Sequence, residues 1–157
     1  MTGEHLIYAL WAGLAIALLI AAVTDLKTRR ISNKLNLAIA LGAPVFWVAS
    51  GMSFWPDMVQ QLGLALIIFG LFTVAFAMGA MGGGDVKLLG AIALWLHWFP
   101  LIEMLIIMSV AGGVLTLITM GHRKFKKITG PAKVPYGVAI SFASLWVIYE
   151  RYINHFI

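Results

Sequence analysis

The chain has 157 residues, of which 62% are hydrophobic and only 11% are charged. Average soluble domains carry about 25% charged residues, so this composition excludes an ordinary soluble domain and favours an integral membrane protein. The absence of cysteine excludes disulfide bonds, thiol nucleophiles and cysteine-ligated zinc. The formal net charge of +5 could indicate a protein that binds nucleic acid. A basic face against the anionic lipids of an inner leaflet explains the same charge. We therefore predict lipid contact and no nucleic-acid partner.

Apolar runs separated by short polar breaks follow one another along the chain. A helix needs about 20 mostly apolar residues to span a bilayer. Six candidate spans are present: Leu6–Thr24, Leu35–Ser50, Met58–Met78, Val86–Phe99, Leu101–Met120 and Tyr136–Tyr152. The first run lacks the basic region and cleavage site of a signal peptide, so we interpret it as a retained helix. The pattern predicts an all-α polytopic membrane protein with about six transmembrane helices, in which residues 1–157 form a single domain.

The basic residues predict the orientation of these spans. When the breaks are assigned alternately to two sides, one side has Arg151 alone and the other has ten basic residues: Lys27, Arg29, Arg30, Lys34, Lys87, Arg123, Lys124, Lys126, Lys127 and Lys133. The positive-inside rule places the ten on the cytoplasmic side. Both termini are then expected outside.

The fourth run is too short for the bilayer. Val86–Phe99 would measure about 21 Å at an α-helical rise of about 1.5 Å per residue, whereas the hydrocarbon core is about 30 Å thick. If its far end reaches the outer surface, the preceding Gly82–Gly84 tract lies at membrane depth. Irregular backbone is tolerated there only inside protein or beside water. We therefore expect Asp85 at the floor of an aqueous pocket that opens to the cytoplasm.

Two of the six acidic residues are expected at the cytoplasmic ends of spans, namely Asp25 and Asp85. Ionisable residues at membrane depth usually have a function. Two simpler interpretations remain open: Asp25 could form an ion pair with Arg29 four residues later, and Asp85 could be the N-cap of the fourth helix. The other four acids fall at outer loops or outer helix ends: Glu4, Asp57, Glu103 and Glu150.

Two carboxyl groups at one depth in a wet pocket suit acid–base hydrolysis. Like charges a few Å apart cannot both ionise easily, so such a pair shares a proton and offers one base and one acid. The sequence gives no sign of a zinc peptidase or a serine peptidase, because the chain contains no H-E-x-x-H and no G-x-S-x-G motif. The spacing of the four histidines is not that of metal ligands: His5, His97, His122 and His155. We therefore predict neither a metal nor another cofactor.

The two acidic segments together resemble the prepilin leader peptidases, which are membrane aspartic proteases of the GxGD type. GGGDVKLLG, residues 82 to 90, resembles their G-x-G-D-x-K-L signature, and DLKTRRISN, residues 25 to 33, resembles their other aspartate motif. The resemblance implies that Asp25 and Asp85 are the catalytic pair. Asn33 of the second motif is retained, whereas Ser32 stands where many members have proline.

The resemblance also implies a substrate and a location. Prepilins and pseudopilins carry a short basic leader that ends in glycine, followed by an apolar helix, and are cleaved at the cytoplasmic face of the bacterial inner membrane. Longer members have an additional cysteine-containing region associated with zinc and with N-methylation. This chain resembles the short form that accompanies tight-adherence (Flp-type) pili, for which methyltransferase activity is not implied.

Further residues are candidates for substrate binding. Gly82, Gly83 and Gly84 would let a substrate backbone approach Asp85 closely. Pro135, Tyr136 and Gly137 could line the site, although a helix start with an interfacial tyrosine explains them as well. Lys87 lies two residues from Asp85, so on a helix it points elsewhere, and we interpret it as a surface anchor rather than a catalytic lysine.

A small proton- or cation-coupled transporter that uses Asp25 and Asp85 is the main alternative function. It would share the aqueous pocket, but it would also need a polar route to the outer side. The outer halves of the predicted spans contain few polar residues. A pocket open to one side favours the peptidase.

Overall fold

The computed structural model describes residues 2–126 and 134–153, and within them every regular element is helical. The elements in chain order are α1 (Thr2–Thr28), α2 (Asn33–Ala49), the π-helical turn η1 (Phe54–Met58), α3 (Val59–Ala77), α4 (Gly83–Ala93), α5 (Trp98–Phe125), α6 (Tyr136–Ile148) and the π-helical turn η2 (Tyr149–Ile153). The predicted all-α class is confirmed. Three residues named above lie outside the described part: Lys127, Lys133 and His155.

The membrane character of the chain rests on its long apolar helices. Three segments are long and apolar enough to cross a bilayer: Glu4–Thr28, Phe54–Ala77 and Trp98–His122. Helix α2 is apolar but has 17 residues, and α4 and α6 have 11 and 13 residues. The helices therefore follow the predicted order, while the number of six crossings stays a prediction.

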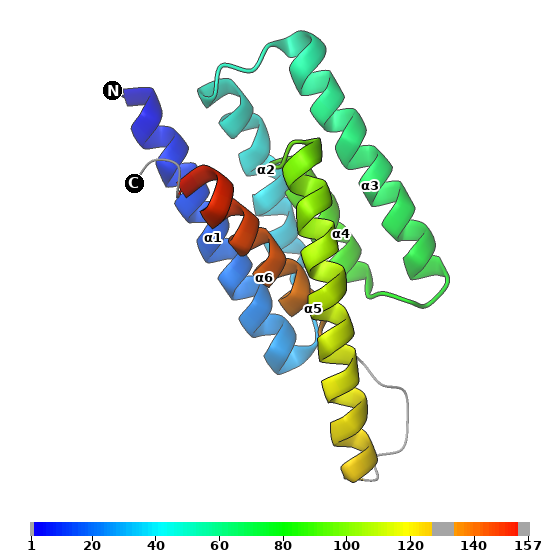
Figure 1. The fold of residues 1–157 in the computed structure, drawn as a ribbon. Coiled ribbons are helices and arrows are strands. Elements are labelled where there is room, and N and C mark those ends of the chain that lie inside the picture. The colour runs from blue at the N-terminus through cyan, green and yellow to red at the C-terminus, as the bar shows by residue number, and fades with distance from the viewer. Residues whose placement is uncertain (1, 127–133, 154–157) are drawn as a thin grey trace.

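Figure 1 shows the six helices running alternately toward one end of the bundle and back. The end of α1 and the starts of α2, α4 and α6 consequently lie toward the same end. We call this the basic end, because it carries Lys27, Arg29, Arg30, Lys34 and Lys87. The start of α1 and the turn η2 lie toward the opposite end.

Helix α4 is the short central element of the bundle. It packs against α2, α3 and α6, and eight of its 11 residues are buried. Leu88, Leu89 and Ile92 are completely enclosed. Because one helix touches three others, the position of its first turn depends on packing along its whole length.

The carbonyl end of α4 is closed by side chains from α2 and α3. The last carbonyl groups of a helix have no partners within it, and inside a bundle they need other donors. Trp47 of α2 donates its Nε1–H to the Leu94 carbonyl at 2.8 Å. Gln61 of α3 donates from Nε2 to the carbonyl groups of Ala93 and Leu96 at 2.7 and 2.8 Å. A helix that ends among apolar neighbours therefore keeps its backbone paired.

The predicted fourth span, Val86–Phe99, is wrong in its limits. Helix α4 begins earlier, at Gly83, and ends at Ala93, and a turn precedes α5 at Trp98. Trp95 within that turn is buried, and its Nε1–H donates to the Ile39 carbonyl at 2.9 Å. The turn is apolar because it is packed against the bundle, and hydropathy alone does not distinguish such a turn from a helix.

We expect Gln61→Leu to destabilise the bundle by about 1–3 kcal/mol, because two buried carbonyl groups would lose their donor. Thermal unfolding of the detergent-solubilised protein, followed by circular dichroism, measures the change. Gln60→Leu is the matched control, since Gln60 is exposed on the same helix. Equal stability of the two variants would contradict the assigned role of Gln61.

Candidate active site

Asp25 lies in the last turn of α1 and is only 5% exposed. The helix ends at Thr28, and Arg29 then adopts a left-handed backbone conformation with φ of 54°, which redirects the chain at a helix end. The buried side chain of Ile31, further along this linker, lies beside Gly84 and Gly137. The linker after α1 thus encloses Asp25 instead of leaving it in solvent.

Asp85 lies in the first turn of α4, three residues after the N-cap residue Gly82, and is 8% exposed. Its carboxyl group turns back toward Gly82, whose backbone N–H donates to it. This is one half of a capping box, because Gly82 has no side chain with which to cap the helix in return. A Cβ atom at Gly82 would lie 2.8 Å from Asp85 Oδ2, so a larger residue there would displace the carboxyl group.

The interpretation of Asp85 as the N-cap of α4 is wrong. Gly82 is the N-cap, and Gly83 and Gly84 are already helical. The glycines are therefore not a flexible lead-in to the helix. Gly84 lies close to the backbone of Ile31, because a Cβ atom there would be 3.5 Å from the Ile31 nitrogen and oxygen. The first turn of α4 is packed directly against the linker that follows Asp25.

The N-terminus of α6 faces the same two aspartates. Its N-cap is Pro135, which makes no side-chain cap, so its first N–H groups need other partners. The backbone N–H groups of Gly137 and Val138 are directed at the Asp25 carboxyl group. The backbone N–H group of Gly137 also reaches the Asp85 carboxyl group. The carboxyl groups of Asp25 and Asp85 are near enough for their charges to interact. Asp85 thus lies at the N-terminus of its own helix, and Asp25, although it belongs to the last turn of α1, faces the N-terminus of α6, where anions are stabilised.

Two cavities open beside the aspartates. Asp25, Arg29, Gly82 and Asp85 line both of them. The larger cavity, of about 340 Å³, is also bounded by residues 79–81, Val134 and Tyr136. The smaller, of about 300 Å³, is bounded by Arg30, Ile31, Gly83 and Gly84. The charge of Arg29 acts on the Asp25 carboxyl group.

One oxygen of Asp25 stands out. Asp25 Oδ2 is buried and has no hydrogen-bond partner within residues 2–126 and 134–153. Buried polar atoms are normally paired. An unpaired carboxyl oxygen beside a second carboxyl group is a place for a shared proton, a water molecule or an atom of a bound ligand.

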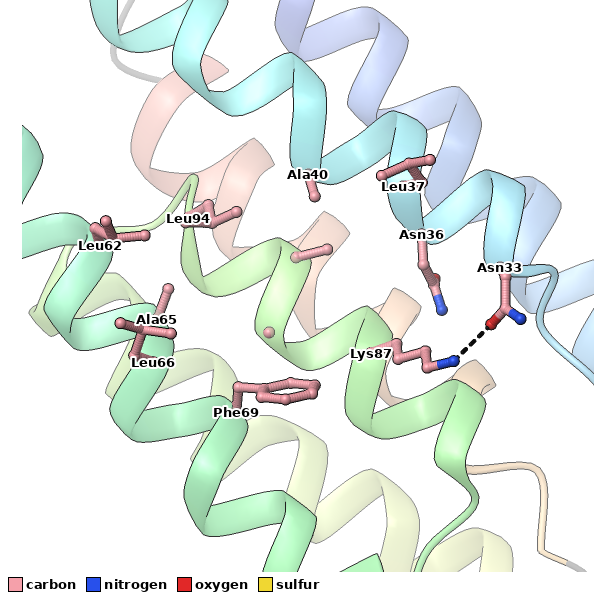
Figure 2. A pocket seen from close by; sticks show the side chains of 12 residues that line it. Asn33, Asn36, Leu37, Ala40, Leu62, Ala65, Leu66, Phe69, Lys87 and Leu94 are labelled. Atoms are coloured by element: carbon pink, nitrogen blue, oxygen red, sulfur yellow. Dashed lines mark hydrogen bonds between the residues drawn. The ribbon is translucent and has the colours of Figure 1, made fainter.

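The structure brings some of the candidate binding residues to the aspartates and leaves others apart. Gly82–Gly84, Tyr136 and Gly137 adjoin the pair, and Pro135 is buried as the N-cap of α6. Lys87 points away, and Figure 2 shows its Nζ donating to Asn33 Oδ1, at 3.0 Å. Lys87 therefore links α4 to α2 at the basic end, on a different side of α4 from Asp85.

Asn36 is a residue of the site that sequence reasoning missed. It is 5% exposed, and its Nδ2 donates to the Gly84 carbonyl at 3.0 Å. This bond ties α2 to the first turn of α4, the turn that carries Asp85. An asparagine within an otherwise apolar helix was the available signal, because a polar side chain is buried only where it finds a partner.

Within residues 2–126 and 134–153, no group of three or more potential metal ligands from histidine, aspartate, glutamate or cysteine comes together.

Comparison with known proteins identifies the family. Residues 12–117 match the type IV leader peptidase family. The chain belongs to this family. It is 32% identical over 123 residues to a prepilin leader peptidase/N-methyltransferase of Pectobacterium carotovorum subsp. carotovorum, covering 74% of this chain and 44% of that protein. It is 28% identical over 145 residues to one of Burkholderia pseudomallei strain 1026b, covering 83% of this chain and 45% of that protein.

The chain thus spans less than half the length of these curated leader peptidase relatives. No solved structure matches it. The family match runs from within α1 to within α5 and hence includes both aspartates, whereas Gly137 on α6 lies beyond it.

We expect Gly137→Ala to lower the free energy of unfolding by about 1–3 kcal/mol, as overfilled sites usually do. A Cβ atom at Gly137 would lie 2.6 Å from Ile31 Cδ1 and 2.9 Å from Asp25 Oδ2. Thermal unfolding tests the change. Gly113→Ala on α5 is the control, since nothing lies within 4 Å of its Cβ position and alanine favours a helix. If Gly137→Ala were as stable as Gly113→Ala, the close approach of α6 to Asp25 would be contradicted.

Proposed function

We propose that this chain is an aspartic endopeptidase that removes the leader from prepilins or pseudopilins, with Asp25 and Asp85 as its catalytic dyad. The observation that carries the proposal is the meeting of the two buried carboxyl groups at two shared cavities. Membership of the type IV leader peptidase family supports peptide hydrolysis. The names of the curated relatives support a prepilin as substrate.

The chemistry follows from one proton shared by the pair. The ionised carboxylate takes a proton from water, and the water oxygen attacks the scissile carbonyl carbon while the protonated partner donates to the carbonyl oxygen. The C–N bond of the resulting tetrahedral centre then breaks, and the departing amine takes the proton that the first carboxyl group removed from water, while the second carboxylate recovers its proton from a hydroxyl group of that centre. The Gly137 N–H, which reaches both carboxyl groups, would hold them at one orientation through both steps.

The residues around the dyad suit an extended substrate. The first turn of α4 presents Gly82 and Gly83 without side chains, so a peptide backbone can approach Asp85 there. Tyr136 forms another wall of the larger cavity, where it would lie against the residues next to the cleaved bond. These residues are proposed to bind substrate and not to transfer protons.

The proposed location is the bacterial inner membrane, with the basic end in the cytoplasm and both termini outside. The three long apolar helices support a membrane protein. The clustering of basic side chains at one end supports the orientation, and anionic lipids of the inner leaflet would surround that end. The cavities beside the aspartates then open where the leader of a membrane-anchored substrate lies.

A transporter is less well supported. A relay through the bundle would need polar groups beyond the aspartates, but α4 continues from Asp85 through the enclosed apolar residues Leu88, Leu89 and Ile92. The polar cluster of Gln61 and His97, joined at 2.9 Å, lies past the carbonyl end of α4. Lys87 of α4 turns toward Asn33, and the residues of α4 after Lys87 have no polar side chain.

We expect Asp25→Asn and Asp85→Asn each to reduce cleavage of a co-expressed prepilin by at least about 100-fold, the scale of a lost acid or base. Loss of the leader is followed by gel mobility, and the new N-terminus by mass spectrometry. Asparagine keeps the shape of each side chain, so the abundance of each variant in the membrane should stay near that of the wild type.

An acidic residue far from the dyad provides the control. Asp57→Asn changes an acid at the opposite end of the bundle, where Asp57 bonds only locally to Ser53, and should cleave normally. Wild-type cleavage by a well-expressed Asp25→Asn or Asp85→Asn variant would remove that residue from the chemistry. Failure of the wild type with several prepilins, together with proton flux that depends on Asp85 in liposomes, would favour the transporter.

A further inference from the structure

A groove on the outside of the bundle remains unused by the proposed chemistry. It has a volume of about 560 Å³ and lies between α2, α3 and α4. Figure 2 shows the side chains that line it. Its lining is apolar for most of its length and polar only at the basic end, where Asn33, Asn36 and Lys87 lie.

We propose that this groove holds an apolar transmembrane helix of the substrate, the helix attached to the bond that the dyad cleaves. The proposal rests on the proposed function. It assigns to the groove, and not to the dyad, the selection of substrates by their membrane segment.

The position of the groove relative to the dyad is the first argument. Lys87 marks the polar mouth and is two residues after Asp85, which corresponds to about 3 Å along the axis of α4. Ile31 lines the smaller cavity of the dyad, and Asn33, two residues later, lines the groove. The first turn of α4, with Gly83 and Gly84, lies between this cavity and the groove. A chain that leaves the groove at its mouth therefore lies about one helical turn of α4 from the aspartates.

The lining decides what kind of occupant fits. Its walls are formed by large apolar side chains, including Leu37, Leu62 and Leu66, and Ala40, Ala65 and Ala91 lie between them. Small residues let helix backbones approach one another closely in membranes. A peptide beside lipid must also pair its own backbone, so it enters as a helix. The small residues would let the backbone of a bound helix come close to the walls of the groove, whereas a flexible lipid chain does not need such small residues in order to fit.

Asn36 supplies a polar contact where such a helix has to end. Its Nδ2 is engaged by the Gly84 carbonyl, but its Oδ1 has no hydrogen-bond partner within the described residues. A substrate must leave the helical conformation before the cleaved bond, because extended backbone is what a dyad can reach. The freed N–H groups then need acceptors, and Asn36 Oδ1 is a suitable one.

Photo-crosslinking tests the proposal directly. Leu66 lines the groove, and Leu71 lies on the same helix outside it, yet both are 61% exposed. We expect p-benzoylphenylalanine in place of Leu66 to crosslink to the apolar segment of a co-expressed prepilin, in the active chain and in an Asp85→Asn background. The same replacement of Leu71 should give at most a tenth of that yield.

A kinetic comparison uses a second matched pair. Ala40→Leu fills the groove from α2, whereas Ala38→Leu adds the same side chain at an exposed position of α2 outside it. We expect Ala40→Leu to raise KM for a full-length prepilin about tenfold, within the range for an overfilled contact, while kcat and the kinetics of Ala38→Leu stay unchanged.

The outcomes separate this inference from the proposed function. Normal cleavage with equal crosslinking at positions 66 and 71, or with crosslinks at 66 to lipid alone, would overturn the groove assignment and leave the dyad intact. Unaltered KM in a well-folded Ala40→Leu variant would do the same. Absence of cleavage by the wild type would instead defeat the proposed function and this inference with it.

Discussion

The arrangement of this protein depends on the confinement of two carboxyl groups among buried helices. A buried carboxylate is costly unless donors surround it, and two neighbouring ones add mutual repulsion. The chain meets this cost with backbone N–H groups from two helix N-termini: α4 through Gly82 and α6 through Gly137 and Val138. These donors are fixed by the helices themselves. The charge of Arg29 also acts on the Asp25 carboxyl group, so backbone dipoles and one basic side chain together lower the cost of burying the pair.

This solution requires that several helices be placed relative to one another within narrow limits. The first turn of α4 contacts the linker after α1, as Gly84 lies against Ile31, and Asn36 of α2 binds the same turn. The far end of α4 is held by Trp47 and Gln61. Helix α4 is thus anchored at both ends, so that Asp85 stays fixed although it follows three glycines.

The glycines have a packing role that their number alone does not reveal. At Gly82 a side chain would displace the Asp85 carboxyl group, and at Gly137 it would meet both Asp25 and Ile31. The flexibility usually expected of a glycine tract is less important here than the room that it leaves. That room is occupied by Asp85, Asp25 and Ile31, so these glycines allow the two acids to come together.

The membrane class, the order of the helices and the two acidic segments could be predicted from the chain alone, because apolar runs and charge positions depend on local composition. The sequence also led to a family that residues 12–117 match. It set the limits of the fourth helix wrongly, since a buried apolar turn and a helix have the same hydropathy. The folded chain was needed to show that Gly82 is the N-cap, that Asn36 supports the Asp85 turn and that α6 faces Asp25. Those features join residues from separate helices, and their partners are chosen by packing, which no local pattern in the chain specifies.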